Sequence, residues 1–228
     1  MQRLLDVFFS SLALLILAPL LIPVVAILRL TGEGEIFFLQ KRVGRGGEPF
    51  KLYKFATMFK DSPNIGTGTV TLHNDPRILP VGRFLRKTKV NELPQLLNVL
   101  KGDMSVIGPR PQTQRCFGAF PEDAQKSIIR VHPGLSGIGS VVFRGEEEIM
   151  HGHQNPSHFY DHVIMPYKGQ LEDWYVQRRG VLTYFSLILI TIWVVVFPKS
   201  QIVWWFFKSL PIQPAKLTPF FSNSTATE

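Results

Sequence analysis

Apolar residues are concentrated at the two ends of the chain, and the long segment between them is polar. Residues 7–28 form a run of 22 residues without a charge, and a membrane-crossing helix needs about 20 residues. Pro19 and Pro23 lie inside this run, where each removes a backbone donor and bends a helix. Residues 1–31 are therefore predicted to form either a kinked span or a helix-break-helix that enters and leaves the membrane on one face.

Positive charge is unequal on the two sides of this run, because Arg3 is the only basic residue before it. By the positive-inside rule, the side on which the run ends is expected to face the cytoplasm. The basic residues that follow the run are Arg29, Lys41, Arg42 and Arg45.

A second uncharged run covers residues 181–197, and its 17 residues are at the lower limit for a span. A tryptophan pair between two lysines follows at residues 199–208, a pattern typical of the membrane–water interface. We therefore predict that residues 181–210 form interfacial amphipathic helices, with a true span or contact with a second copy of the chain (a homodimer) as the alternatives. Residues 211–228, with three prolines and a polar end, are predicted to be disordered.

The polar middle, residues 32–180, must hold any chemistry and is expected to form one water-exposed domain. Residues 36–40 and 50–55 are strand-like and are joined by the glycine-rich segment 43–49, which predicts a β-hairpin. The glycines of this segment do not have the spacing of a phosphate-binding loop, so we interpret them as a turn. With the helix described next, this indicates an α/β (α+β) domain.

Leucines recur at helical spacing between residues 93 and 100, and Gly102 is a plausible stop. Asn91 is expected to cap this helix, and Glu92 suits its first turn, where the helix dipole favours an anion. Two interpretations stay open: a well-capped amphipathic helix, or a helix start that receives an anionic substrate. The second interpretation is based on the basic residues that precede the helix, which are Arg83, Arg86, Lys87 and Lys89.

Arg110 lies between Pro109 and Pro111, which fix the backbone on both of its sides. A guanidinium presented from so stiff a loop matches a phosphate group in a bidentate manner. A second glycine-rich loop covers residues 132–139 and is followed by Arg144.

Four histidines and Asp161 gather at residues 151–162, and His158 and His162 have the i,i+4 spacing of a zinc-binding helix. No thiolate is near, and glycine, asparagine and proline in the segment favour a solvated loop instead. The first two histidines are His151 and His153.

The chain carries 25 Lys+Arg against 17 Asp+Glu, a net charge of +8, which indicates an anionic partner such as a phosphorylated molecule or lipid headgroups. Nucleic acid is not expected, because neither a helix-turn-helix nor an aromatic platform on a basic strand is recognisable. A single cysteine, Cys116, excludes a disulfide scaffold.

Several segments together resemble the bacterial sugar transferase family, the monotopic phosphoglycosyl transferases. The resemblance is most specific between residues 83 and 111 and becomes loose beyond Arg144. The matching segments are residues 53–55, 75–77, 82–88, 92–105, 107–111 and 133–137, together with the proline-containing N-terminal run.

This resemblance implies transfer of a phospho-sugar from a UDP-sugar to undecaprenyl phosphate, with release of UMP and a need for Mg²⁺, as the first membrane step of polysaccharide or glycoconjugate biosynthesis. It implies a re-entrant N-terminal helix and a small catalytic domain on the cytoplasmic face of the bacterial inner membrane. The sugar is left open, and residues 145–170 are expected to carry its specificity. The residues that match phosphate and nucleotide contacts are Lys54, Arg77, Arg86, Lys87, Arg110 and Arg144.

The chain departs from the family at one position, because Asn91-Glu92 stands where the family has Asp-Glu, with the Asp as nucleophile. An amide is a poor nucleophile and a weaker magnesium ligand than a carboxylate. Three explanations are open: another carboxylate attacks, the transfer is direct with Glu92 orienting metal and acceptor, or the chain is a catalytically silent scaffold. The catalytic and metal-binding candidates are Asn91 and Glu92, with Asp103 and the acidic triplet Glu146, Glu147 and Glu148 as alternatives.

Overall fold

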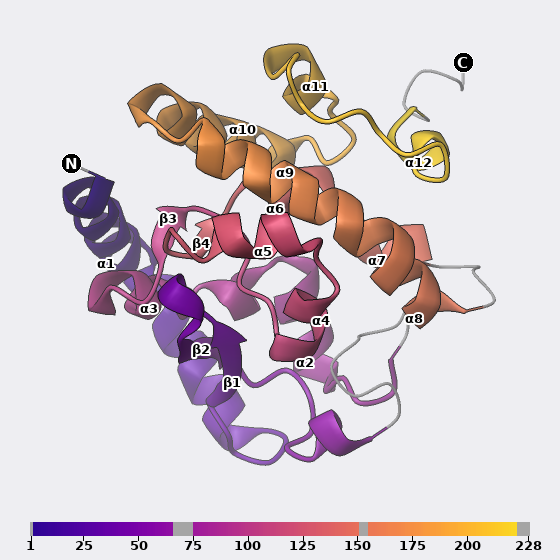
Figure 1. The fold of residues 1–228 in the computed structure, drawn as a ribbon. Helices are drawn as coiled ribbons and strands as arrows, with labels where there is room; N and C mark the ends of the chain where they lie inside the picture. The colour runs from indigo at the N-terminus through magenta and orange to yellow at the C-terminus, as the bar shows by residue number, and fades with distance from the viewer. Residues whose placement is uncertain (1, 66–74, 151–154, 223–228) are drawn as a thin grey trace. The chain divides into compact units, whose positions relative to one another are not determined.

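The computed structural model describes residues 2–65, 75–150 and 155–222, which fold as two compact units (Figure 1). The first unit comprises Met1–Arg42 and Pro49–Val106, and the second comprises Val43–Glu48 and Ile107–Glu228. The expectation of a membrane helix, a catalytic domain of residues 32–180 and a C-terminal membrane segment stays a prediction. Each apolar end belongs to a unit that also contains polar elements.

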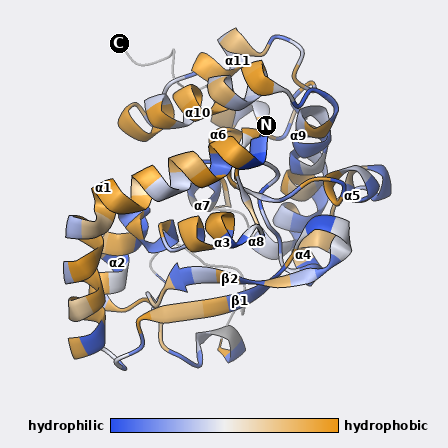
Figure 2. Ribbon diagram, turned by 90° about the vertical axis from the view of Figure 1, so that its left-hand side faces the viewer, coloured by the Kyte–Doolittle hydropathy of each residue, from blue (hydrophilic) through white to orange (hydrophobic). Residues whose placement is uncertain are grey.

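The first unit begins with α1 (Gln2–Leu30), one continuous helix that contains both Pro19 and Pro23. The expected break into two helices is therefore not found, although Figure 2 shows the helix changing direction along its length. A bend without a break is the usual effect of proline inside a helix. Among the described residues, α1 is the one helix that is long and apolar enough to cross a membrane.

Both ends of α1 pack on the same unit. Near the start, Asp6 is buried, and its carboxylate accepts hydrogen bonds from the Ser105 hydroxyl and the Val106 main-chain N–H, each at 2.9 Å. Near the end, Val24 and Leu28 join a buried cluster with residues of the following elements. Between the two ends the side chains are mostly exposed, so the apolar middle of the helix has no protein partner in this unit.

The hairpin is confirmed as β1 (Phe37–Val43) paired with β2 (Pro49–Phe55). Its turn contains the short 3₁₀ segment η1 (Arg45–Gly47). Gly46 and Gly47 have φ values of 73° and 80°, a left-handed backbone that glycine adopts at no steric cost. The glycines therefore make the turn, as the sequence analysis expected.

The leucine-rich helix forms as α3 (Gln95–Lys101), but it begins later than expected. Pro94 occupies the position before it, and Asn91 lies in a separate 3₁₀ turn, η3 (Val90–Glu92). The expectation that Asn91 caps the helix is therefore wrong. Lys89 has a left-handed φ of 61°, which separates η3 from the preceding helix and starts this extra turn. The other short elements of the unit are η2 (Ser62–Asn64) and α2 (Pro80–Lys87).

The second unit is mainly helical, and its long helix α9 (Met165–Gln177) packs against α5 and α6 (Figure 1). β3 (Ser105–Ile107), whose last residue opens this unit, pairs with β4 (Gly134–Ser136). Small sheets and many helices confirm the mixed class. The remaining helices before α9 are α4 (Gln114–Gly118), α5 (Glu122–Ile128), α6 (Ile138–Val142), α7 (Glu146–Met150), α8 (Pro156–Phe159) and η4 (Tyr160–Ile164).

The second apolar run forms α10 (Val181–Val196), which packs one face against α6 and β4. Its 16 residues extend about 24 Å at 1.5 Å per residue, less than the roughly 30 Å of a bilayer core. The outer face is not polar, because Leu182 and Leu189 are among several exposed apolar residues there. Figure 2 shows this apolar character continuing into α11 (Ile202–Phe206).

The prediction of a disordered tail is wrong for residues 211–222. A short helix, α12 (Thr218–Ser222), follows an irregular segment, and Leu217 and Phe221 are both buried. The ring of Phe221 contacts the rings of Phe143 and Trp204 at centroid distances of 5.6 and 5.7 Å. The aromatic residues outweigh the effect of the prolines on this segment, and residues 223–228 lie outside the described part of the chain.

We expect Asp6→Ala to lower the free energy of unfolding by roughly 2–3 kcal/mol, because it leaves the Ser105 hydroxyl and the Val106 N–H without their charged acceptor. Denaturant unfolding of the detergent-solubilised protein measures this. Glu35→Gln, which weakens an exposed ion pair with Lys60, is the control and should leave the same quantity nearly unchanged. Equal effects of the two substitutions would contradict an anchoring role for Asp6.

Candidate functional site

In the first unit, a buried amide joins the second strand of the hairpin to α3. The Asn98 Oδ1 accepts the main-chain N–H of Tyr53 at 2.9 Å, and its Nδ2 donates to the Lys51 carbonyl at 2.8 Å. Asn98 thus replaces a neighbouring strand at this part of β2. The next residue of β2 is Lys54, so the amide fixes the backbone from which that side chain projects.

Lys54 and Glu92, two of the predicted site residues, lie together. The Lys54 Nζ is 3.6 Å from the Glu92 Oε1, and both side chains are less than one fifth exposed. Glu92 lies in the η3 turn that follows the left-handed Lys89, and β2 contacts this turn directly. The structure therefore brings a cation and a carboxylate to one partly enclosed place from segments about forty residues apart.

Asn91, the residue before Glu92, is buried at 6% exposure. Its Oδ1 has no hydrogen-bond partner among the described residues. A buried amide oxygen without a partner is costly, on the order of 1–3 kcal/mol, and in a native protein calls for an explanation such as an ion or water. The oxygens of Asn91 and Glu92 are of the hard type that Mg²⁺ prefers.

Within residues 2–65, 75–150 and 155–222, no three His, Cys, Asp or Glu side chains converge on a metal position. Two oxygen donors are nevertheless compatible with Mg²⁺, which usually keeps several waters and binds one or two protein groups together with substrate phosphates. The donor set of Asn91 and Glu92 therefore fits such an ion.

The alternative carboxylates are occupied elsewhere. Asp103 accepts a hydrogen bond from the Asn98 Nδ2 at 3.1 Å, and so closes the end of α3. Glu146 accepts two hydrogen bonds from the Lys168 Nζ, at 2.9 and 3.0 Å, in the second unit. Glu148 is exposed, as expected for a solvated acidic run.

Arg77 has a structural role that the sequence analysis did not foresee. Its guanidinium is buried and makes a bidentate pair with Asp75, at 2.8 and 2.6 Å. The same group donates to the carbonyls of Ser62 and Ile65. With its donors directed at these groups, Arg77 holds a loop together, and its contact with a substrate phosphate stays a prediction. Arg86 and Lys87 lie in the last turn of α2, where Arg86 is half-buried and Lys87 is exposed.

Arg110 belongs to the second unit, where glycines allow its loop to be packed tightly. A Cβ atom on Gly134 would lie 2.1 Å from the Gly108 nitrogen, and one on Gly137 would lie 2.1 Å from the Gly108 oxygen. Gly108 donates to the Ser136 carbonyl at 2.9 Å, and Gly134 donates to the Pro109 carbonyl at 2.8 Å. The second glycine-rich loop is therefore a support for the Arg110 loop.

Two buried charged residues of α9 were missed by the sequence analysis. Glu172 is fully buried, and its Oε1 accepts the main-chain N–H of Arg110 at 3.1 Å. The Gly139 main-chain N–H also bonds to this carboxylate, and burial raises the pKa of Glu172 to about 7. Lys168 is 1% exposed and pairs with Glu146. Their i,i+4 spacing on a helix resembles an ordinary surface pair, so the sequence carries no signal of their burial.

Arg144 follows α6 and is half-buried, and this burial lowers the pKa of its guanidinium. Of the histidines, His158 and His162 stack with ring centroids 4.1 Å apart, in helical segments where a loop was expected. Asp161 pairs with Arg115 at 2.9 Å. His151 and His153 lie outside the described residues, and the described ones do not form a metal site.

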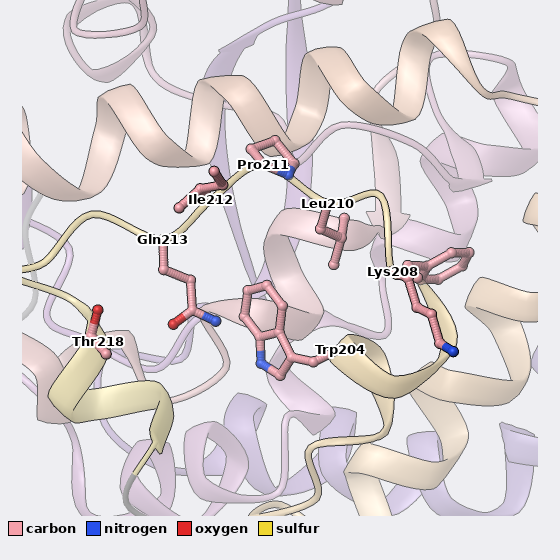
Figure 3. A pocket seen from close by; sticks show the side chains of 8 residues that line it. Trp204, Lys208, Leu210, Pro211, Ile212, Gln213 and Thr218 are labelled. Atoms are coloured by element: carbon pink, nitrogen blue, oxygen red, sulfur yellow. The ribbon is translucent and has the colours of Figure 1, made fainter.

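A separate pocket lies in the C-terminal segment of the second unit (Figure 3). The indole of Trp204 lies between Gln213 and Lys208 in this view, and Thr218 lies at the far side. None of the predicted site residues lines this pocket.

A family model described as bacterial sugar transferase matches residues 1–198. A UDP-N-acetylgalactosamine-undecaprenyl-phosphate N-acetylgalactosaminephosphotransferase of Aeromonas hydrophila is 37% identical over 143 residues, which is 62% of this chain and 34% of that protein. The exopolysaccharide production protein PSS of Rhizobium leguminosarum bv. phaseoli is 40% identical over 148 residues, covering 62% and 73%. A putative undecaprenyl-phosphate N-acetylgalactosaminyl 1-phosphate transferase of Bacillus subtilis is 43% identical over 150 residues, covering 64% and 79%. The match thus spans about a third of the length of the Aeromonas relative.

We expect the stability of the protein to fall as the pH rises from about 5 to about 8, by up to about 3 kcal/mol through Glu172 alone. Its pKa is 4.5 when unfolded and about 7 when folded, so the folded state holds the proton more tightly in this window and loses that advantage as the pH rises. Lys168 and Arg110 lower this pKa but do not overcome burial.

Unfolding free energies of the wild type and Glu172→Gln, measured across this pH range, test the assignment. The difference between the two proteins should change in favour of the Gln variant with rising pH. Parallel curves would show that Glu172 does not titrate in this window.

Proposed function

The chain belongs to the bacterial sugar transferase family, and we propose that it transfers a phospho-sugar from a UDP-sugar to undecaprenyl phosphate and releases UMP. The names of the relatives from Aeromonas hydrophila and Bacillus subtilis support this acceptor and this type of transfer. The relative from Rhizobium leguminosarum supports a place in exopolysaccharide production.

One observation carries the proposal: Lys54 pairs with Glu92, and Asn91, the residue before Glu92, has a buried amide oxygen without a partner among the described residues. A cation that binds a phosphate, a carboxylate, and a free oxygen for a metal are the parts that phosphoryl transfer needs. Mg²⁺ held by Asn91 and Glu92 would neutralise the charge of the donor diphosphate. In the first unit, Lys54 binds a phosphate oxygen in this proposal, and Arg86 and Lys87 add positive charge. In the second unit, Arg110 and Arg144 are the candidates for phosphate contacts.

Glu92 is the reacting carboxylate in this proposal, because Asp103 and Glu146 are both engaged in hydrogen bonds of their own. A Glu92 oxygen attacks the sugar-bearing phosphorus, and the bond from that phosphorus to UMP breaks, so UMP leaves with the electron pair. The phosphate oxygen of undecaprenyl phosphate then attacks the same phosphorus and displaces Glu92. Asn91 does not react and only orients.

The membrane geometry in this proposal is re-entrant, with the catalytic elements at the cytoplasmic face of the bacterial inner membrane. The packing of both ends of α1 on the first unit supports it, because a helix that crossed the bilayer would place its two ends on opposite faces. The outer face of α10 is apolar, and in this proposal it lies against lipid, with a second copy of the chain as the alternative.

We expect purified protein in nanodiscs to release UMP only when undecaprenyl phosphate, Mg²⁺ and a suitable UDP-sugar are all present.

Glu92→Gln should lower kcat by at least about a hundred-fold, because the amide cannot attack phosphorus. Asn91→Asp should at least retain turnover, because it restores a stronger metal ligand at a buried position that has no competing partner. UMP release and mass spectrometry for a phospho-sugar adduct on the protein measure both steps.

Glu148→Gln is the matched control, an exposed carboxylate whose loss should leave kcat unchanged. If turnover occurs without any adduct and Glu92→Gln abolishes it, the transfer is direct. Glu92 then assists the reaction without forming a covalent bond. Turnover by Asn91→Asp alone would mean that the natural chain is a silent member of the family.

The re-entrant geometry is tested with single cysteines in a Cys116→Ser background. Gln2→Cys and Thr31→Cys should both react with a membrane-impermeant maleimide in inverted vesicles, and neither should react in intact spheroplasts. Residue 2 is the first residue of α1 and residue 31 follows its end, so a spanning helix would give opposite labelling of the two. That outcome would overturn the re-entrant geometry.

A further inference from the structure

Two side chains of α9, three residues apart, form hydrogen bonds with the loop that carries Arg110. The Glu172 Oε1 accepts the Arg110 N–H at 3.1 Å, and the Tyr175 hydroxyl donates to the Ile107 carbonyl at 3.0 Å. Residues three apart on a helix lie on the same face, so both contacts come from one side of α9. One contact accepts and the other donates, which fixes the loop at its beginning and at its arginine.

Main-chain hydrogen bonds to β4 also hold the loop. Gly108 and Pro109 bond to the β4 segment, and a Cβ on any of Gly108, Gly134 or Gly137 would lie less than 3 Å from backbone atoms. The backbone therefore has little room to move at these glycines. Pro109 and Pro111 restrict the φ angles on either side of Arg110.

The carboxylate of Glu172 is buried, and burial of a carboxylate costs free energy. Its hydrogen bond to the Arg110 loop therefore indicates a role for this residue. It is fully buried, and its Oε2 has no partner among the described residues. Gly139 allows this approach, because a Cβ there would lie 2.3 Å from the Glu172 Oε1. An apolar residue in the same position would pack more easily but would leave two main-chain N–H groups, those of Arg110 and Gly139, without an acceptor.

We propose that Glu172 is a positioning residue for the transfer reaction: its buried carboxylate holds the main chain of Arg110 and so fixes where the guanidinium meets a phosphate of the substrate. The proposal rests on the proposed function, in which Arg110 binds phosphate. Glu172 does not touch the substrate and acts through Arg110. A misplacement of about 1 Å in a positioned group lowers a rate by up to about a hundred-fold, so a remote carboxylate has a measurable effect.

The test combines an exchange measurement with a double-mutant cycle on the full-length protein in nanodiscs. Glu172→Leu removes the acceptor, and Glu172→Gln keeps a carbonyl oxygen. Hydrogen–deuterium exchange of the loop reports the contact directly, because Pro109 and Pro111 have no amide hydrogen and Arg110 is the only amide between them. We expect that amide to lose protection in Glu172→Leu and to keep it in Glu172→Gln.

The kinetic arm measures kcat/KM for UMP release in the natural and Arg110→Ala backgrounds. Glu172→Leu should lower kcat/KM by about ten-fold or more when Arg110 is present, and by less than about two-fold when it is absent. Glu172→Gln should recover most of the loss. Leu171→Ala, an adjacent buried residue, is the control for general destabilisation, and its effect should be the same factor in both backgrounds.

An equal effect of Glu172→Leu in the two backgrounds, or unchanged protection of the Arg110 amide, would overturn the positioning role. Absence of UMP release from the wild type with every UDP-sugar would instead count against the proposed function. The exchange arm then still decides whether Glu172 holds the loop, because it does not depend on turnover.

Discussion

Buried main-chain N–H and C=O groups need hydrogen-bond partners, and this requirement determines much of the structure. Here it is met by side chains at several places where no sheet supplies the partner. The two sheets have only two strands each, so the residues expected to do chemistry lie on turns and loops rather than inside a ladder of strands. Buried polar side chains supply the missing partners. Asn98 serves β2 beside Lys54, Asp6 serves Val106, and Glu172 serves Arg110. Each removes an unpaired main-chain group and at the same time fixes a segment with a predicted function.

The same requirement explains how an apolar helix is attached to a polar unit. The middle of α1 exposes apolar side chains that only lipid or another apolar surface can cover. Its ends instead carry specific contacts: Arg3 donates to the carbonyls of Val99 and Leu100, and Asp6 accepts from two groups nearby. Charged residues at the start of an otherwise apolar helix are thus used for docking. These contacts, one of them from the buried Asp6, also orient the helix relative to the rest of the first unit.

Much of the fold could be predicted from local patterns, because those features depend on few residues. The hairpin followed from strand-like runs around glycines, the C-terminal end of α3 from Gly102, and the apolar helices from uncharged runs. The predictions failed where the backbone takes an unusual local conformation or where distant contacts decide. Asn91 looked like a helix cap, but the left-handed Lys89 and Pro94 delay the helix start. The tail looked disordered, but its aromatic residues contact residues far away in the chain.

Charged residues show the same limit in the site. Arg77 and Lys87 belong to one basic segment, yet Arg77 is buried against Asp75 and Lys87 is exposed. Glu172 and Lys168 have the spacing of a surface pair, yet both are buried, and Lys168 pairs with Glu146 instead. Sequence pattern reports which charges are present. Burial, which decides whether a charge binds a substrate or supports the backbone, depends on residues far away in the chain.

The amide at position 91 is best understood against this background. Asn98, a polar side chain that supports the fold, has both ends of its amide engaged with main-chain groups. Asn91 is also buried, but its oxygen has no hydrogen-bond partner among the described residues. That oxygen therefore does not stabilise the fold. A polar atom that is costly to bury and structurally unused is best explained by a ligand. In the proposed function, Asn91 is therefore a candidate metal ligand, and Glu92, one residue later and paired with Lys54, is the carboxylate that reacts.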